Sequence, residues 1–277
     1  MSIFSHCVVF ILGAIIGSFL NVVLYRLHTG KSLNGRSHCM SCGKTLSWYE
    51  LFPIFSYIAQ GGRCRGCSAY IPSRYLFVEL LTGFAFVSVW HLFSTNLILL
   101  CLYLILILIL ILILVYDIRH TIIPDELTLM VCSVALGFVG YAYTLTKSLA
   151  IVGESITSGI FAGGFLGGLW LISKGRWIGL GDAKLAFPLG VIVGLGGVFS
   201  MMVFSFWIGM VISLTLLLFE RILKKGKTNL HFHSAPLTMR SEVPFAPFLI
   251  AGFLSVQFLH ADIFDITYTL FLSHFLS

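Results

Sequence analysis

Charged side chains are scarce in this sequence. Only 10% of the 277 residues are charged, whereas 58% are hydrophobic, and the mean hydropathy is +1.00. Soluble globular domains carry roughly 25% charged residues, which cover their surface with groups that water solvates. The composition therefore excludes an ordinary soluble enzyme or binding module and predicts an integral membrane protein.

The apolar residues gather into runs of about 20, the length that a helix needs to cross a bilayer. The run at 97–116 alternates Leu and Ile with the two-residue period of a strand, but its length and its lack of turn residues favour a helix embedded in lipid. The sequence predicts an all-α polytopic membrane protein with about eight transmembrane helices, near residues 7–25, 76–93, 97–116, 127–146, 151–173, 183–199, 200–219 and 244–260.

Basic residues are missing from the start of the chain, where a secretory signal peptide has them, so no cleavable signal peptide is expected. Small residues recur one helical turn apart in several runs. Such pairs let membrane helices approach closely. Close helix packing is therefore expected at Gly13 and Gly17, Gly163 and Gly167, Gly164 and Gly168, and Gly190 and Gly194.

The basic residues are distributed unevenly over the loops. Sixteen of the 17 Lys and Arg residues fall in the alternate loops 26–74, 117–126, 174–184 and 220–243, and only Lys147 falls elsewhere. Because cytoplasmic loops of membrane proteins are rich in Lys and Arg, these four loops are expected in the cytoplasm and both termini outside. No stretch interleaves basic and aromatic residues, so the positive charge indicates topology in a lipid bilayer and no nucleic-acid partner.

The loop between the first two spans has the composition of a small soluble domain and carries two CxxC pairs. Cys39 and Cys42 form the first pair and Cys64 and Cys67 the second, with 21 residues between the pairs. This spacing predicts a structural zinc site with four thiolate ligands, in which the metal replaces a core that so short a loop cannot build. The alternatives are disulfides or free thiols; a reducing cytoplasm disfavours the disulfides.

Five of the eleven acidic residues lie near the predicted cytoplasmic ends of the spans: Glu79, Asp117, Asp125, Glu126 and Asp182. Asp117 closes the third span and Asp182 opens the sixth, so they arrive from different loops at similar depth. Two neighbouring carboxylates do not both ionise easily; one activates water while the other, protonated, polarises a scissile carbonyl. Asp117 and Asp182 are therefore candidates for an aspartyl protease pair.

Asp182 stands at the end of the tetrapeptide GLGD. The absence of side chains at Gly179 and Gly181 would let a substrate backbone approach the acid and would permit unusual φ and ψ at the helix start. The alternative is that Asp182 only caps the sixth helix, since Asp is a preferred N-cap residue.

Five segments taken together resemble one family. In order and spacing they are similar to the type IV prepilin peptidases, intramembrane aspartyl proteases of the GxGD type in the bacterial inner membrane. The segments are GSFLNVVLYRL, LSWYELFPIFSYIAQGGRCRGC, IPSRYLFVELLTG, YDIRHTIIPDELTL and GLGDAKL. One departure is Met40, because the family usually carries proline after the first cysteine; metal binding is expected to survive this change.

The resemblance implies a division of the chain into a first span at 1–25, a zinc-binding region associated with methyl transfer at 26–75, and a multi-span peptidase core at 76–277. It implies that Asp117 and Asp182 are the catalytic pair, supported by the two GLGD glycines. The rival to Asp117 is Asp125, although a carboxylate that follows a proline at a helix start is explained by capping.

The resemblance also implies two activities. Family members of this cysteine-bearing type cleave the leader peptide of type IV prepilins and pseudopilins after a glycine on the cytoplasmic side. They then methylate the new N-terminal residue with S-adenosylmethionine. Three other functions are considered: a peptidase without methylation, a transporter whose carboxylates carry protons or ions, and a non-catalytic membrane adaptor built around the zinc loop, which would leave the membrane aspartates unexplained.

Glu50 and Glu79 are candidate contributors to methylation and its cofactor binding. The sequence has no nucleoside-binding glycine loop after a strand, so S-adenosylmethionine is implied by the resemblance alone. Glu50 has the alternative roles of a solvated loop charge or a partner of nearby arginines. The alternative for Glu79 is an ion pair with Arg74, which precedes it by little more than one helical turn.

Overall fold

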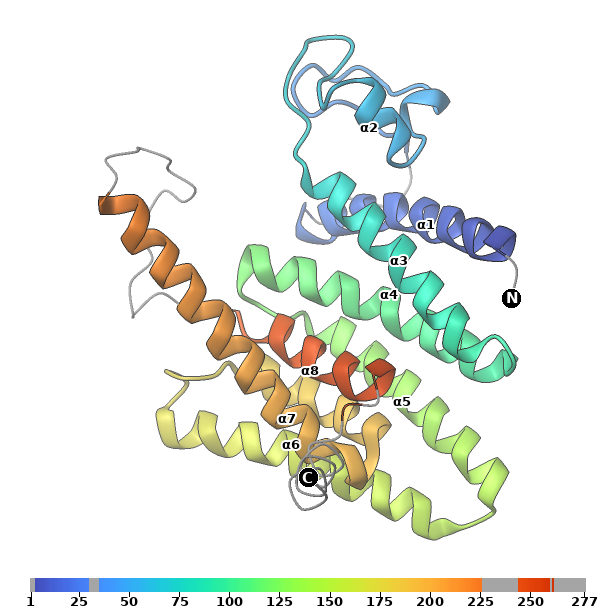
Figure 1. Ribbon diagram of the computed structural model, residues 1–277, viewed down its shortest axis with the longest axis vertical. Coiled ribbons are helices and arrows are strands. Elements are labelled where there is room, and N and C mark those ends of the chain that lie inside the picture. Colours follow the sequence, from blue (N-terminus) through green and yellow to red (C-terminus); the bar gives the residue numbers. More distant parts are fainter. Residues whose placement is uncertain (1–2, 30–34, 226–243, 260, 262–277) are drawn as a thin grey trace, which may run out of the picture. The chain divides into compact units, whose positions relative to one another are not determined.

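The computed structural model describes residues 3–29, 35–225, 244–259 and 261. Helices make up most of this part of the chain, and its β-type pairings are two isolated bridges in the loop before α3. The elements are α1 (Ile3–Thr29), η1 (Trp48–Glu50), α2 (Phe55–Ala59), α3 (Arg74–Phe93), α4 (Leu97–His120), α5 (Asp125–Thr146), α6 (Leu149–Ser173), α7 (Leu180–Lys225) and α8 (Ala246–Leu259), as drawn in Figure 1.

The prediction of an all-α polytopic membrane protein is confirmed. Six helices in the described part of the chain (α1 and α3 to α7) are long and apolar enough to cross a membrane, and α8 is a shorter apolar helix. The expected spans at 183–199 and 200–219 both lie within α7. The helix is broken at Gly194, whose φ of 77° and ψ of 175° suit glycine, and not at the expected boundary after residue 199.

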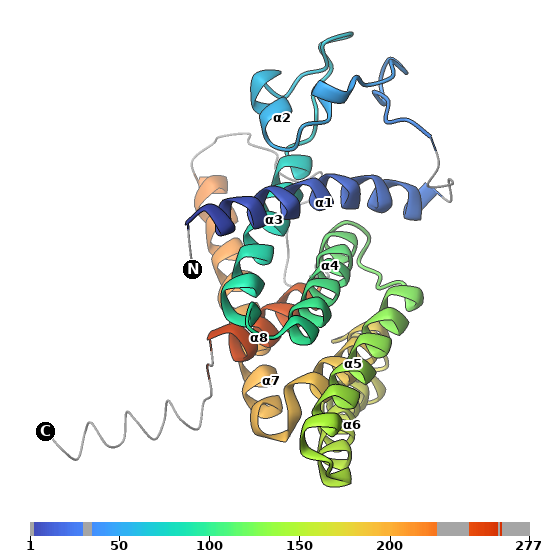
Figure 2. The same cartoon turned by 90° about the vertical axis from the view of Figure 1, so that its right-hand side faces the viewer.

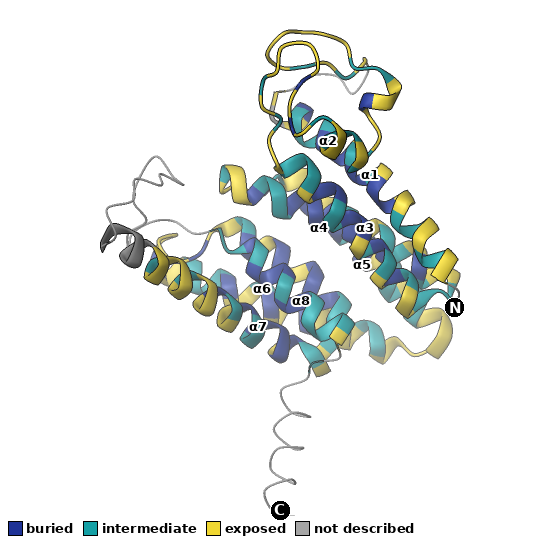
Figure 3. Ribbon diagram, turned by 45° about the horizontal axis from the view of Figure 1, so that its top comes forward, coloured by how far each residue is buried: buried dark blue, intermediate teal, exposed yellow. Residues whose placement is uncertain are grey.

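The chain forms two compact units, Met1–Val115 and Tyr116–Ser277. In the first unit α1 packs on α3, and the two helices lie across one another in both Figure 1 and Figure 2. The cysteine-bearing loop with η1 and α2 connects them. Figure 3 shows that exposed residues cover much of this loop, whereas the helices carry buried faces. The small loop therefore has little apolar core of its own.

In the second unit α7 packs on α6 and α8, and α5 contacts both α6 and α7. This unit begins within the last turns of α4, and Thr121, the first residue after that helix, adopts a φ of 53°. Asp125 and Glu126 lie in the first turn of α5, where negative charge is favourable. These helix ends bring the end of α4 and the starts of α5, α7 and α8 into one unit.

Glycines make close helix packing possible at four of the expected positions. A Cβ on Gly13 or Gly17 of α1 would lie 2.9 Å from backbone atoms of α3, and one on Gly163 of α6 would lie 3.2 Å from the Ala183 carbonyl oxygen of α7. One on Gly190 of α7 would lie 2.8 Å from the Ala162 Cβ of α6. The same prediction is wrong at the remaining positions, where no described atom lies within 4 Å: Gly164, Gly167, Gly168 and Gly194.

Substitution of Gly190 by Ala is expected to destabilise the second unit. The added methyl group would meet the Ala162 Cβ at 2.8 Å and the Ser158 carbonyl oxygen at 2.9 Å, so α6 and α7 must move apart. Overpacking of this kind costs about 1–3 kcal/mol, and thermal unfolding in detergent should show a lower midpoint. Gly167→Ala is the matched control on α6, where the site is open; an equal loss of stability in both variants would contradict the packing role.

Candidate functional site

Asp117 and Asp182 lie close together in the second unit. Asp117 occupies the last turn of α4 and Asp182 the first turn of α7, and their carboxylates interact electrostatically. Both residues are buried, with 4% and 7% of their surface exposed. The sequence analysis expected these two aspartates to arrive from different loops at similar depth, and the structure does bring them together.

Each of the two carboxylates lies at the N-terminus of a helix. The backbone N–H of Ala246, the first residue of α8, donates to Asp117. Helix N-termini carry partial positive charge, which favours a nearby carboxylate. The second oxygen of Asp117, Oδ2, is buried and has no hydrogen-bond partner among the described residues. Such an atom is costly unless a water molecule or a ligand uses it.

The carboxylate of Asp182 is partly engaged by the start of its own helix. Its Oδ2 accepts a hydrogen bond from the Gly179 N–H at 3.1 Å, a contact that helps to close the first turn of α7. Asp182 is the third residue of that helix and not its N-cap. The alternative that Asp182 only caps the helix therefore holds in part: its carboxylate accepts a hydrogen bond at the helix start, and it also interacts with Asp117.

Both glycines of GLGD lie where a side chain would be crowded. A Cβ on Gly181 would lie 3.1 Å from the Cβ of Ile123, and one on Gly179 would lie 3.1 Å from the Asp182 Oδ2. Neither glycine has a positive φ, so the expected unusual backbone at the helix start is not present. Gly181 lets α7 approach the loop that follows Asp117, and Gly179 leaves room for the carboxylate.

The contacts of Asp125 differ from those of Asp117 and Asp182. Its Oδ1 forms an ion pair with the Nζ of Lys184 at 2.7 Å, and its side chain is 66% exposed. The helix starts after Pro124 as predicted, but the N-cap residue is Pro124 itself, which makes no side-chain capping bond, and Asp125 is the first residue of the helix. This ion pair joins the first turn of α5 to Lys184 of α7, and both of its side chains are exposed.

The four loop cysteines form one cluster. All four Sγ atoms lie within 4.8 Å of one another, and Cys39 Sγ lies 3.8 Å from Cys67 Sγ. A tetrahedral zinc ion with Zn–S bonds of about 2.3 Å would separate its sulfurs by about 3.8 Å, so the donor set fits a metal. The cysteines are not joined by disulfides. The cluster is therefore a four-cysteine metal-binding site, intact despite Met40.

The two CxxC pairs fold into matching turns. In each turn the first cysteine accepts a backbone hydrogen bond from the fourth residue after it, Gly43 or Ser68, and both of these residues have positive φ. The N–H groups of Cys42 and Ser41 also lower the pKa of Cys39 to about 6. A thiol held in this way loses its proton readily, as a metal ligand must.

A cavity of about 560 Å³ lies within the first unit, and Cys39 and Cys64 of the metal-binding cluster form part of its wall. Its size is in the range of small-molecule sites, which are mostly apolar with a few polar groups. Its wall combines aromatic side chains with the two candidate carboxylates of the loop and α3, and includes Asn21, Tyr25, Glu50, Tyr57, Tyr75 and Glu79.

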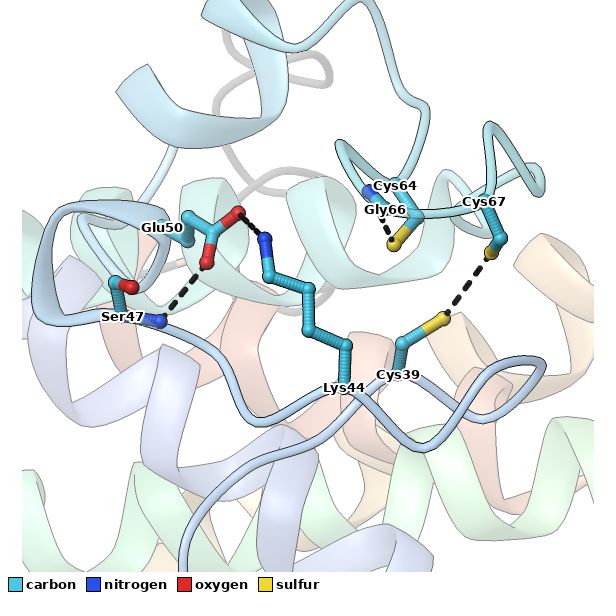
Figure 4. A network of polar contacts seen from close by, with 7 residues as sticks. All are labelled: Cys39, Lys44, Ser47, Glu50, Cys64, Gly66 and Cys67. Carbon is cyan, nitrogen blue, oxygen red and sulfur yellow. Dashed lines mark hydrogen bonds and ion pairs between the residues drawn. The ribbon is translucent and has the colours of Figure 1, made fainter.

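Glu50 is buried at this cavity, and its neighbours favour the ionised form of its carboxylate. The Ser47 N–H donates to its Oε2 at 2.8 Å and the Lys44 Nζ lies 3.3 Å from its Oε1, and these groups hold its pKa below the usual value. The Lys44 side chain also packs across Gly66, where a Cβ would lie 3.0 Å from the Lys44 Cδ. Figure 4 shows that Lys44 thus lies between the cysteine cluster and Glu50. The solvated-charge alternative for Glu50 is wrong.

Glu79 lines the same cavity from α3. It is 7% exposed, and its Oε2 accepts a hydrogen bond from the Ile54 N–H at 2.7 Å. Its carboxylate also bonds to Ser18 of α1. Arg74 instead lies over the ring of Tyr75, 5.2 Å from its centre. The described residues therefore do not form the alternative contact, an ion pair between Glu79 and Arg74.

Two family models match the chain. The bacterial peptidase A24 N-terminal domain matches residues 11–93, which include the four cysteines, and the type IV leader peptidase family matches residues 104–214, which include Asp117 and Asp182. A relative from Vibrio cholerae, named prepilin leader peptidase/N-methyltransferase, is 30% identical over 67% of this chain and 76% of its own length. The chain belongs to the type IV leader peptidase family.

Other relatives carry the same name. The protein from Myxococcus xanthus is 32% identical, and the alignment covers 76% of this chain and 62% of that relative. The protein from Aeromonas hydrophila is 28% identical over 90% of this chain and 89% of its own length. The chain thus spans less than two thirds of the Myxococcus relative. No solved structure matches the chain.

Sequence reasoning missed three residues that contact the candidate carboxylates: Lys44, Lys184 and Ala246. Lys44 and Lys184 were counted only as basic loop charges, yet each holds one of the candidate carboxylates. Lys184 lies two residues after Asp182, so its place beside the site could have been noted. Ala246 acts through its backbone N–H, which has no signature in the side-chain pattern.

Proposed function

We propose that this protein is an intramembrane aspartyl protease and N-methyltransferase. It cleaves the leader peptide of type IV prepilins and pseudopilins after a glycine on the cytoplasmic side and methylates the new N-terminal residue. The observation that carries the peptidase is the buried carboxylate of Asp117, whose Oδ2 has no partner among the described residues and which interacts with Asp182.

Asp117 and Asp182 act as one pair in peptide cleavage. Because two neighbouring carboxylates resist double ionisation, they share one proton and titrate together. The ionised member takes a proton from the attacking water, and the protonated member polarises the scissile carbonyl. The helix N-terminus at Ala246 and the Gly179 N–H each hold one carboxylate in place, and this limits its motion during proton transfer.

Methyl transfer belongs to the cavity of the first unit. S-adenosylmethionine supplies, when bound, an electrophilic methyl group on a positively charged sulfonium. The negative carboxylate of Glu50 attracts a cationic group by Coulomb forces, and the same wall carries Tyr25 and Tyr57, whose aromatic rings are of the kind that bind cations. This chain's residues thus bind and orient the donor and the pilin amine within one cavity.

The remaining assignments follow from the same proposal. The four-cysteine cluster holds Zn²⁺ as a structural ion, since four protein ligands leave no open position for chemistry. The protein lies in the bacterial inner membrane with the cysteine loop toward the cytoplasm, as its basic loops indicate, and its partners are prepilin-like proteins and lipid, not nucleic acid. The transport alternative is not favoured, because the matched relatives are named as processing enzymes.

The test is mass spectrometry of a prepilin-like substrate incubated with the detergent-solubilised protein and S-adenosylmethionine. Loss of the leader together with a gain of one methyl group is the expected result. Cleavage without methylation would support the peptidase proposal and contradict the methyltransferase proposal. If several substrates remain uncleaved, the peptidase proposal itself fails.

A further inference from the structure

The backbone at Ile54 adopts a conformation that is rare for its residue type. Its φ of 63° and ψ of −56° lie outside the left-handed helical region, and Ile is β-branched. The Phe55 N–H donates to the Pro53 carbonyl oxygen at 2.6 Å, which closes a three-residue turn. These angles are those of the strained form of the γ-turn. Such a residue persists only where its surroundings hold it.

The contact that holds Ile54 is the carboxylate of Glu79. The turn points the Ile54 N–H toward α3, where Glu79 Oε2 accepts it at 2.7 Å. Glu79 is itself fixed, because α1 approaches its Cα so closely that a Cβ on Gly17 would lie 2.9 Å away. The Ser18 side chain bonds to the same carboxylate. A rigid junction of α1 and α3 therefore holds the strained turn.

The strained turn lies between two parts of the cavity wall. Glu50 and Leu51 precede it, and Ser56 and Tyr57 of α2 follow it, and all four residues line the cavity. The segment 48–59 is largely exposed, with Trp48 and Phe55 each 73% exposed, so packing does little to fix it. Lys44 contacts Glu50 at one end of the segment and the Tyr57 hydroxyl donates to the Ile71 carbonyl oxygen at the other, while the hydrogen bond to Glu79 ties the turn between them to α3.

We propose that Glu79 is a positioning residue for methyl transfer: its carboxylate holds the strained Ile54 turn and thereby places Glu50 and Tyr57 at the cavity. This assignment rests on the proposed methyltransferase and divides the two candidate carboxylates by role. Glu50 faces the ligand, whereas Glu79 acts through the backbone of another segment. The distinction is testable, because relief of the strain should substitute for the anchor.

The experiment compares Glu79→Gln, Glu79→Ala and the double variant Glu79→Ala with Ile54→Gly in the full chain. Glu79→Gln keeps an acceptor oxygen and should methylate within about threefold of the wild type, while Glu79→Ala should lose about tenfold or more. Adding Ile54→Gly should restore most of the rate, because glycine adopts these angles without strain. Leader cleavage, which belongs to the other unit, should stay unchanged and report a folded protein.

The matched control is Ile58→Gly in the Glu79→Ala background. Ile58 lies in the ordinary helix α2 and is 65% exposed, so its replacement should restore nothing. A large loss in Glu79→Gln, or equal rescue by both glycines, would overturn the proposal. Amide hydrogen exchange tests the role of Glu79 independently of methylation. The Ile54 amide should exchange faster in Glu79→Ala than in the wild type. Unchanged exchange would show that Glu79 does not hold the Ile54 turn, even if the wild type methylates no substrate.

Discussion

Replacement of Asp182 by Asn should reduce leader cleavage by about 10³-fold or more, because general acid–base groups contribute on this scale. Asn retains an acceptor for the Gly179 N–H, so the start of α7 should persist. It does not take up or release a proton at neutral pH, and the shared proton of the pair is lost. Cleavage rates of a prepilin-like substrate, measured by mass spectrometry, give the result.

Asp117→Asn should show the same loss, and Asp125→Asn is the matched control. Asp125 forms an exposed ion pair with Lys184, and such pairs contribute roughly 0–1 kcal/mol, so cleavage should fall by no more than a few fold. The double variant of Asp117 and Asp182 should be no worse than either single variant, since the two act as a unit. Loss in Asp125→Asn with retention in Asp117→Asn would assign the first catalytic role to Asp125.

The helical architecture was predictable because the membrane leaves few alternatives. A run of apolar residues in lipid must satisfy its backbone internally, so each long run became a helix. The break in α7 was not predictable at its true position. The sequence places glycines at 190, 194, 196 and 197, and the structure uses Gly194 for the break, Gly190 for contact with α6 and Gly197 for contact with Val193 and Val256.

The proximity of Asp117 and Asp182 could be anticipated from depth alone, because helix ends at one membrane face meet in one layer. The surroundings of Glu50 and Glu79 could not. Glu50 is buried by a loop that folds around four cysteines, and Glu79 meets Ile54 only because Gly17 brings α1 against α3. Contacts of this kind depend on loop geometry and close approach, which the pattern of apolar and charged residues does not encode.

The second large effect is expected at the cysteine cluster. Cys64 is its buried member, and Cys64→Ser removes one of four ligands, so the metal content of the purified protein should fall. Without the metal the two turns separate, and Lys44 loses its packing on Gly66 and its hold on Glu50. Methylation should then drop by about 10–100-fold, the range found when the support of a metal site is removed.

Leader cleavage separates this explanation from general unfolding. The cysteine cluster lies in Met1–Val115 and the aspartate pair in Tyr116–Ser277, so Cys64→Ser should cleave within about threefold of the wild type. Cys101→Ser, an exposed cysteine of α4 outside the cluster, should keep both activities and the metal. Lys44→Met should keep the metal but lose methylation. Such a variant uncouples metal binding from Glu50, and normal methylation in it would show that the metal acts on the cavity by another route.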